Sequence, residues 1–303
     1  MGNRLDQAPK PSSPLRLRCR DDSTGPLRMR LVLKIAYEGG HFGGWQRNPA
    51  FRTVQGELEA ALAAVGLPGK LQAASRTDRG VHAEGQVAHL KLGKTDRPPD
   101  PKEVQRRLAE VLPEDLSVVD AALAPGRFHA RWSSRGKVYR YRIAFHEAPR
   151  AWRLPDPRGF PNVPPEARLD VEAMRSAARL LRGRRPLRGL ASFHSRFDRG
   201  VHRPRFMCPV LTVEPDGVVS IYVSGGGFFR HQIRNLVGLL CEVGYGMRDP
   251  AEVSTLVERR PYHEGPRAPG WGLTLLRVRY PLPLDPFREP RWQPGRTRTF
   301  SGP

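Results

Sequence analysis

The sequence has little cysteine and no long apolar run. Only Cys19, Cys208 and Cys241 occur among its 303 residues, and no two of them have the C-x-x-C spacing of a zinc ribbon or a redox motif. We therefore expect reduced thiols and no disulfide framework. No segment approaches roughly 18 consecutive apolar residues, and no apolar signal-peptide core follows the N-terminus, so neither a membrane span nor a secretory signal is expected. A cytoplasmic location follows by default.

Acidic residues and lysine are scarce beside arginine. The chain has 51 basic and 30 acidic residues, for a formal net charge of +21, and seven of the basic residues are lysine. Such an excess indicates a polyanionic partner, and nucleic acid is the obvious one. A GC-rich genome also favours arginine over lysine, so the arginine bias by itself identifies no function.

The nine histidines are scattered along the chain. His82 and His89 are the pair that a metal site would use, but no carboxylate or cysteine near them completes a recognisable ligand set. We expect no metal and no cofactor.

Hydrophobic periodicity predicts an α+β fold in two parts, each with a mainly antiparallel sheet. Residues 29–130 show strand patterns at 30–37, 86–92 and 116–122, with helices capped by Thr53 and Asp100. Residues 131–282 show strand patterns at 138–145, 209–214, 218–223 and 273–280, a hairpin turn at Pro215-Asp216-Gly217, and helices capped by Asp170 and Asp249. Residues 1–28 have no apolar period and are expected to be disordered, and residues 283–303 look like a polar tail. Met29 is an alternative translation start.

Residues 228–243 have the clearest helical pattern. Apolar side chains recur at Phe229, Ile233, Leu236, Leu240 and Val243, and Arg230 and Arg234 would share another face. A cation on so apolar a helix needs a partner, and a carboxylate is the natural one. The alternative is an arginine directed to solvent.

Basic residues gather between Arg175 and Arg205. Asp198 is the single acid among Arg179, Arg182, Arg184, Arg185, Arg188, Arg196, Arg199 and Arg203. So local an excess of one charge favours a phosphate-binding surface over a solvated loop.

A turn-rich loop at residues 74–83 contains Arg76, Asp78 and Arg79. Thr, Asp and Gly are turn formers, so residues 77–80 could be a plain tight turn with solvated arginines. The sequence around the loop, however, resembles the catalytic loop of the TruA family of tRNA pseudouridine synthases. Further motifs of that family follow in its order: Gly44-Trp45-Gln46-Arg47, Val54-Gln55, Gly85-Gln86-Val87-Ala88-His89, Phe128-His129-Ala130-Arg131, Tyr139-Arg140-Tyr141 and Phe229 to Gly238.

The resemblance extends from about Met29 to about Pro281, and it implies a pseudouridine synthase fold whose two parts flank a basic cleft. It also implies a homodimer that binds tRNA and modifies uridines 38, 39 and 40 in the anticodon arm. The residues that it places in the site are Asp78, Arg76 and Arg234 as catalytic groups, Tyr139 as the platform under the target base, and Arg79 and His82 as substrate contacts.

Pseudouridine formation breaks the C1′–N1 bond of uridine, turns the uracil and rejoins it through C5. An ionised carboxylate is a weak nucleophile and a good leaving group, which suits a bond that must form and then break. Three roles stay open for Asp78: attack on C1′, attack on C6, and removal of a sugar proton. Two other functions also stay open, namely an RNA-binding protein of the same fold without catalysis and a synthase for a different uridine.

Overall fold

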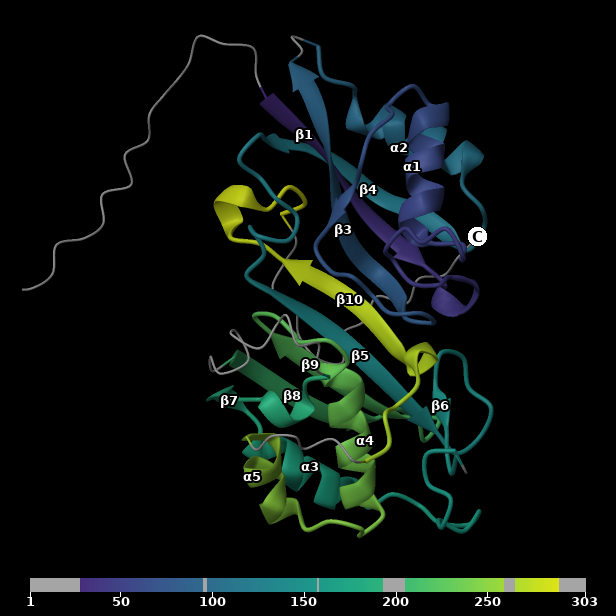
Figure 1. The fold of residues 1–303 in the computed structure, drawn as a ribbon, viewed down its shortest axis with the longest axis vertical. Coiled ribbons are helices and arrows are strands. Elements are labelled where there is room, and N and C mark those ends of the chain that lie inside the picture. The colour runs from purple at the N-terminus through teal and green to yellow at the C-terminus, as the bar shows by residue number, and fades with distance from the viewer. Residues whose placement is uncertain (1–27, 95–96, 157, 193–204, 259–264, 289–303) are drawn as a thin grey trace, which may run out of the picture.

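Ten strands form one sheet that runs through the molecule from end to end (Figure 1). The computed structural model describes residues 28–94, 97–156, 158–192, 205–258 and 265–288, and every structural statement below concerns these ranges. Strand order is β4-β1-β3-β10-β5-β9-β8-β7, with β2 beside β3 and β6 beside β5. The strands are β1 Arg28–Tyr37, β2 Gln72–Ala73, β3 His82–Lys94, β4 Leu116–Pro125, β5 Gly136–Ala144, β6 Trp152–Arg153, β7 Gly183–Arg185, β8 Arg205–Val213, β9 Val219–Gly225 and β10 Leu273–Arg279.

The middle of the sheet is a short parallel joint between β3 and β10. Thr274 lies opposite His82 and Leu275 opposite Ala83, whereas the long pairings on either side of the joint are antiparallel. The prediction of mainly antiparallel strands is therefore confirmed. The expectation of a separate sheet in each part was wrong, because β10 pairs with both β3 and β5 and so joins the two groups of strands into one sheet.

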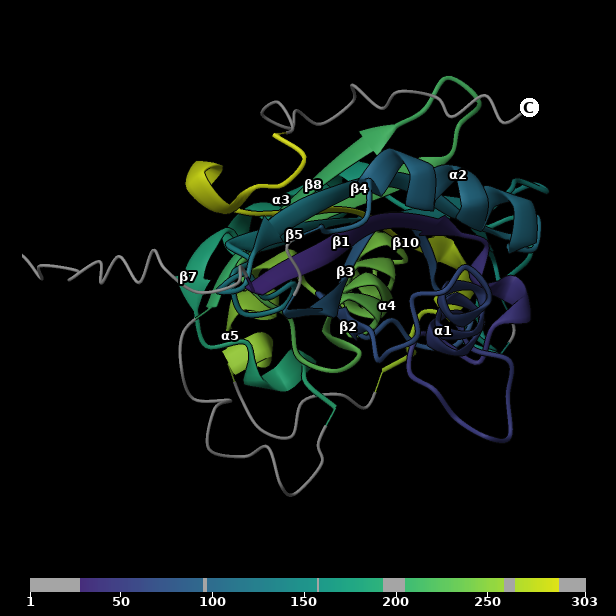
Figure 2. The ribbon, with the colours of Figure 1, turned by 90° about the horizontal axis from the view of Figure 1, so that it is seen from above.

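Helices gather at both ends of this sheet. The helices α1 Val54–Ala64 and α2 Pro101–Val111 lie at the β1–β4 end, and α3 Val171–Leu180, α4 Gln232–Gly244 and α5 Val253–Glu258 at the β5–β9 end (Figures 1 and 2). Three predicted caps are confirmed, since side chains accept backbone N–H bonds from the first helical turn: Thr53 from Gly56, Asp100 from Lys102, and Asp170 from Ala173. Such caps satisfy donors that a helix start otherwise leaves unpaired.

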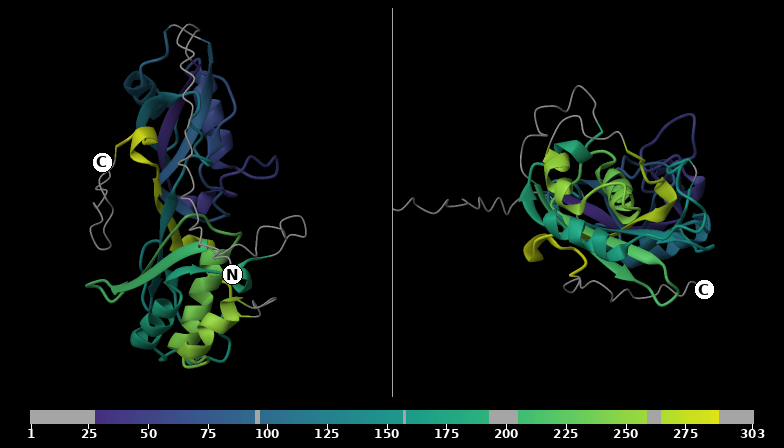
Figure 3. Two further views of the ribbon diagram at one scale, coloured as in Figure 1. Left: turned by 90° about the vertical axis from the view of Figure 1, so that its left-hand side faces the viewer. Right: turned by 90° about the horizontal axis from the view of Figure 1, so that it is seen from below.

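The Asp249 cap signature marks a 3-10 turn, Pro250–Glu252, that leads directly into α5. The predicted hairpin is confirmed as well. Gly217 has φ +82°, a conformation that glycine adopts without strain, and the hairpin that it closes extends beyond the rest of the sheet (Figure 3).

The predicted helix at 228–243 begins four residues later than expected. His231 has φ +59°, in the left-handed region, so the helix cannot extend through it, and α4 starts at Gln232. Phe229 and Arg230 therefore lie on a loop, and Arg230 does not share a helix face with Arg234. All faces of α4 are buried along most of its length, so it is a core helix with no solvent-facing side.

One hydrophobic core continues beneath both ends of the sheet. It contains Leu33 of β1, Trp45 of the loop before α1, Tyr141 of β5 and Leu236 of α4. Smaller 3-10 turns are η1 Gly39–His41, η2 Arg188–Leu190, η5 Gly270–Gly272 and η6 Leu282–Leu284. This shared core fixes the position of one end of the sheet relative to the other. The site described below contains residues from both ends.

Several predictions fall wholly or partly outside the described residues. These include the disorder of residues 1–27, the tail beyond residue 288, and Arg196, Arg199 and Arg203 of the basic cluster. Within the described part of that cluster, Arg175 pairs with Glu172, and Arg185 lies 3.7 Å from Glu258. None of the described helices has the length and apolar character needed to cross a membrane, and no group of metal-binding side chains occurs in the described part of the chain.

Candidate active site

Asp78 lies on the loop between β2 and β3, which are antiparallel neighbours. The loop backbone is held by buried polar groups. The Gln86 side chain accepts a bond from the Ser75 N–H (3.2 Å) and donates one to the Ser75 carbonyl (2.8 Å). Thr77 shares a 2.8 Å hydrogen bond with the Tyr37 hydroxyl, and its carbonyl accepts from the Trp45 N–H at 3.1 Å. These bonds therefore fix the backbone of residues 75–77, directly before Asp78.

Two glycines let neighbouring backbone approach the same loop. Gly44 has φ +102°, and a Cβ there would lie 2.8 Å from the Thr77 carbonyl oxygen. A Cβ at Gly270 would lie 2.3 Å from the Arg79 carbonyl oxygen. Any side chain at either position would therefore displace the backbone that carries Asp78.

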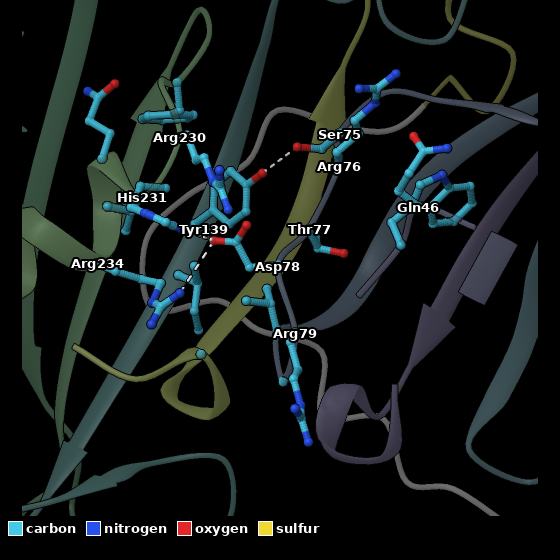
Figure 4. Close-up of a pocket in the computed structure, with 18 of the residues that line it drawn as sticks. Gln46, Ser75, Arg76, Thr77, Asp78, Arg79, Tyr139, Arg230, His231 and Arg234 are labelled. Carbon is cyan, nitrogen blue, oxygen red and sulfur yellow. Dashed lines mark hydrogen bonds and ion pairs between the residues drawn. The ribbon is translucent and has the colours of Figure 1, made fainter. Parts of the chain in front are cut away.

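The Asp78 carboxylate, 31% exposed, faces two nitrogen donors from the start of α4 (Figure 4). Arg234 Nη1 lies 3.4 Å from Asp78 Oδ2, and His231 Nε2 lies 3.5 Å from the same oxygen. Arg234 also donates from Nε to the Ala268 carbonyl at 2.6 Å, which orients its guanidinium. The buried cation that the helix pattern implied thus meets a carboxylate, and Oδ1 of Asp78 has no hydrogen-bond partner among the described residues.

His231 is the residue that the sequence reasoning missed. Its Nδ1 lies 2.9 Å from Ser192 Oγ, and that oxygen also accepts bonds from Arg267 (3.2 Å) and Asn235 (3.5 Å). Because both of those groups can only donate through these atoms, the Ser192 hydrogen points to Nδ1, which leaves the imidazole hydrogen on Nε2, facing Asp78. Burial lowers the pKa of His231 to about 4, against the attraction of Asp78, so the ring is neutral near pH 7.

A signal for His231 was present in the sequence. It follows Arg230 inside the motif from Phe229 to Gly238, but helical periodicity assigned it to a helix interior. A histidine in a left-handed conformation just before a helix is uncommon, and such positions concentrate at functional sites.

Tyr139 of β5 is buried beside the loop. Its hydroxyl shares a 2.7 Å hydrogen bond with Ser75 Oγ, and the Phe228 ring meets it edge-on with centroids 5.4 Å apart. Burial raises the pKa of Tyr139, so the phenol is neutral. The structure therefore brings Tyr139, Asp78 and Arg234 into one cavity, as the sequence prediction required.

The other three predicted residues do not contact the carboxylate. The exposed Arg76 side chain extends away from Asp78 (Figure 4), and the arginine that contacts the carboxylate is Arg234. Arg79 is also exposed, with its guanidinium 5.6 Å from the centroid of Phe51.

His82 is buried behind the loop. Its Nδ1 accepts the Gly39 N–H at 3.0 Å and also lies 2.9 Å from Glu38 Oε2, and its Nε2 lies 3.0 Å from the Trp271 carbonyl. Burial lowers the pKa of His82. His82 thus links two backbone segments, a geometry that supports a positioning role better than a substrate contact.

The cavity around Asp78 has a volume of about 2250 Å³. Pockets for small ligands measure roughly 300–1,000 Å³, so this opening suits part of a macromolecule. Its described lining has two acids, Asp78 and Asp156, and ten arginines and lysines, among them Arg47, Lys70, Arg131, Arg158 and Arg267. The arrangement places the Asp78 carboxylate and the neutral Tyr139 ring in a cavity where basic residues outnumber acids ten to two.

A family model and several known proteins match this chain. A family model described as tRNA pseudouridine synthase matches residues 184–281. The tRNA pseudouridine synthase A of Syntrophotalea carbinolica is 38% identical over 258 residues, which cover 83% of this chain and 96% of that protein. The protein of the same name from Paramagnetospirillum magneticum is 37% identical over 261 residues (83% and 95%), and that of Chlamydia trachomatis serovar A is 32% identical over 260 residues (85% and 94%).

Proposed function

The chain belongs to the tRNA pseudouridine synthase family, and on this basis we propose that Asp78 carries out the isomerisation of uridine in the anticodon arm of tRNA. Isomerisation of tRNA uridine to pseudouridine is the activity of the family. The observation that carries the assignment is geometric. Asp78 is a carboxylate in a cavity whose charged lining residues are mostly cations, where simple RNA binding has no use for an anion.

The proposed reacting atom is Asp78 Oδ1. Arg234 and His231 both contact Oδ2, which leaves Oδ1 directed to the substrate without a competing donor. The Arg234 charge keeps the carboxylate ionised when bound RNA removes water from the cavity. Whether Oδ1 attacks C1′, attacks C6 or removes a sugar proton, each role needs an ionised oxygen with a free lone pair.

The proposed substrate site places the target base on Tyr139. A base must leave its stack to reach this ring, and a flat aromatic surface stabilises the extruded uracil by stacking. Arg76 and Arg79 are exposed beside Asp78 and line the same cavity, so we assign them contacts with the RNA backbone. Arg76 acts in the catalytic loop by holding the RNA, and Arg234 acts on the carboxylate.

The basic cavity between residues 29–130 and residues 131–282 is the proposed tRNA-binding cleft. The substrate positions 38, 39 and 40, a homodimeric assembly and a cytoplasmic location complete the proposal, and they rest on the resemblance to the TruA family. Its support in the structure is the position of the cavity, whose lining includes the Asp78 loop, Tyr139 of β5 and the start of α4.

The test is a pseudouridine map of total RNA from a strain that lacks this protein. We expect the loss of pseudouridine at positions 38–40, restoration by the wild-type gene, and no restoration by Asp78→Ala. The purified Asp78→Ala protein should bind tRNA with unchanged Kd and lose at least ~10⁴-fold in rate. Loss at another tRNA or ribosomal RNA position would reassign the substrate, and restoration by the Asp78→Ala gene would refute the catalytic assignment.

A further inference from the structure

Trp132 is an exposed tryptophan on the wall of the same cavity. Its side chain is 74% exposed, the highest value among the large exposed aromatic side chains of the described residues. An indole contributes a large apolar surface, and water is an unfavourable environment for it. The ring lines the cavity that contains Asp78, but none of the roles proposed above uses it.

The turn that carries Trp132 is built to hold the ring in place. His129 Nδ1 accepts the backbone N–H bonds of both Arg131 (3.1 Å) and Trp132 (3.2 Å), and Ser134 Oγ donates to the Arg131 carbonyl at 2.8 Å. The Arg131 guanidinium lies 4.8 Å from the Trp132 ring centroid, and the His129 ring lies 5.9 Å away. The tryptophan is therefore positioned before any ligand arrives, which lowers the entropy cost of binding.

We propose that Trp132, together with Arg131, is a second stacking platform, which binds a nucleobase of the tRNA other than the base that is modified. The proposal rests on the proposed function, and it adds a binding site to it. Aromatic rings stack on nucleobases, and an adjacent arginine adds a cation for the base or the neighbouring phosphate. The cationic lining of the cavity favours RNA as the occupant over an apolar protein surface.

The two platforms differ in the kind of base that they can accept. Tyr139 is 6% exposed and enclosed by Phe228 and the Asp78 loop, so only an extruded base reaches it. Trp132 is open to solvent and accepts a base in a single-stranded segment. Seven residues separate Trp132 from Tyr139, which limits the distance between their Cα atoms to about 25 Å. Both bases therefore belong to the same region of the bound RNA.

The experiment compares tRNA binding and catalysis for Trp132→Ala, Trp132→Phe and Leu282→Ala. Leu282 is 80% exposed and lies outside the cavity lining, so it controls for the loss of any exposed apolar side chain. We expect Trp132→Ala to raise Kd by roughly 5- to 100-fold, Trp132→Phe to recover most of the affinity, and Leu282→Ala to change nothing. The single-turnover rate at saturating enzyme is measured beside Kd, so that a loss of affinity is separated from a loss of chemistry.

The salt dependence of Kd separates stacking from charge. Trp132→Ala should leave the slope of log Kd against log salt unchanged. Arg131→Ala should reduce this slope by about 1, the value for the loss of one phosphate contact.

A double-mutant cycle then identifies the base. Anticodon-arm RNAs with one abasic nucleotide each are bound by the wild type and by Trp132→Ala. At one position, the abasic change should weaken wild-type binding and leave the variant unaffected.

Two results would overturn the inference. Additive effects at every abasic position would show that Trp132 contacts no base. A change of oligomeric state in Trp132→Ala with unchanged tRNA affinity would assign the ring to an interface between two copies of the chain. In either case wild-type pseudouridine formation would still support the proposed function, so the two proposals can fail separately.

Discussion

The two segments that form the site are held in different ways. The Asp78 loop is fixed through its backbone, by Gln86, Thr77 and the close approach of two glycines. At the start of α4 the groups that face Asp78 are held through their side chains, with His231 bonded to Ser192 and Arg234 to the Ala268 carbonyl. The carboxylate that we propose as the catalytic group thus has a rigid backbone mount, whereas the groups that contact it are side chains.

This contrast suggests where the site tolerates change. A substitution that disturbs the loop backbone moves the oxygen that we propose to react, and a misplacement of ~1 Å can cost ~10²-fold in rate. A substitution at the start of α4 changes the charge and donors around an oxygen that stays in place. Two predictions test this difference, and a third, with the smallest effect, concerns a buried histidine outside the site.

The largest effect is expected for Arg234→Gln. It removes the positive charge 3.4 Å from Asp78 Oδ2 and leaves a shorter, neutral side chain with an amide donor. We expect the single-turnover rate to fall by ~10²- to 10³-fold, as for the loss of one preorganised electrostatic group, with little change in Kd for tRNA.

Arg230→Gln is the matched control for Arg234→Gln. Arg230 lies four residues earlier, is exposed and lines the same cavity, and the ion pairs of the Asp78 carboxylate are with Arg234 and His231. It should weaken tRNA binding in a salt-dependent way and leave the single-turnover rate intact. Equal rate losses in both variants would show that charge in the cavity matters and its position does not.

Gly270→Ala tests the backbone mount. The new Cβ would lie 2.3 Å from the Arg79 carbonyl oxygen, so the loop must shift. We expect a rate loss of ~10²-fold and a loss of unfolding free energy of about 1–3 kcal/mol. Gly40→Ala, where nothing lies within 4 Å of the added Cβ, should change neither quantity. A Gly270→Ala enzyme with normal activity would contradict the rigid-mount interpretation.

The smallest effect is expected for His89 of β3, which is fully buried. Burial, with help from nearby His129, Arg30 and Lys91, lowers the pKa of His89 to about 4, and unlike His231 it has no carboxylate to oppose this. The neutral ring therefore contributes stability that is complete above the unfolded pKa of about 6.5 and is lost as pH falls toward 4.

Urea unfolding at several pH values measures this contribution. Between pH 7 and pH 4.5 the wild type should lose about 2 kcal/mol more unfolding free energy than His89→Gln. Parallel pH curves for the two proteins would show that His89 keeps its ordinary pKa in the fold.

Sequence reasoning succeeded where the signal is local. The caps at Thr53, Asp100 and Asp170 depend on side chains within three residues of the helix start, so composition alone locates them. The pairing of Arg234 with Asp78 spans 156 residues, and it followed from family resemblance together with the need of a buried cation for a partner.

Sequence reasoning failed for features that depend on an unusual backbone conformation or on residues far away in the sequence. The left-handed conformation of His231 is invisible to a helical period, so α4 was started too early. The direction of the Arg76 side chain depends on what surrounds the loop in three dimensions. The hydrophobic pattern predicts that β3 and β10 are strands, but it does not predict that these two strands pair with each other.

That late pairing has a consequence for synthesis on the ribosome. Ala83 and its partner Leu275 are 192 residues apart, so at ~5–20 residues per second β10 emerges roughly 10 to 40 s after β3. During that interval β1, β3 and β4 can already pair, and the edge of β3 at Ala83 stays open. An open strand edge invites pairing with other chains. The nascent protein therefore carries Asp78 next to an open strand edge until most of the chain has been made.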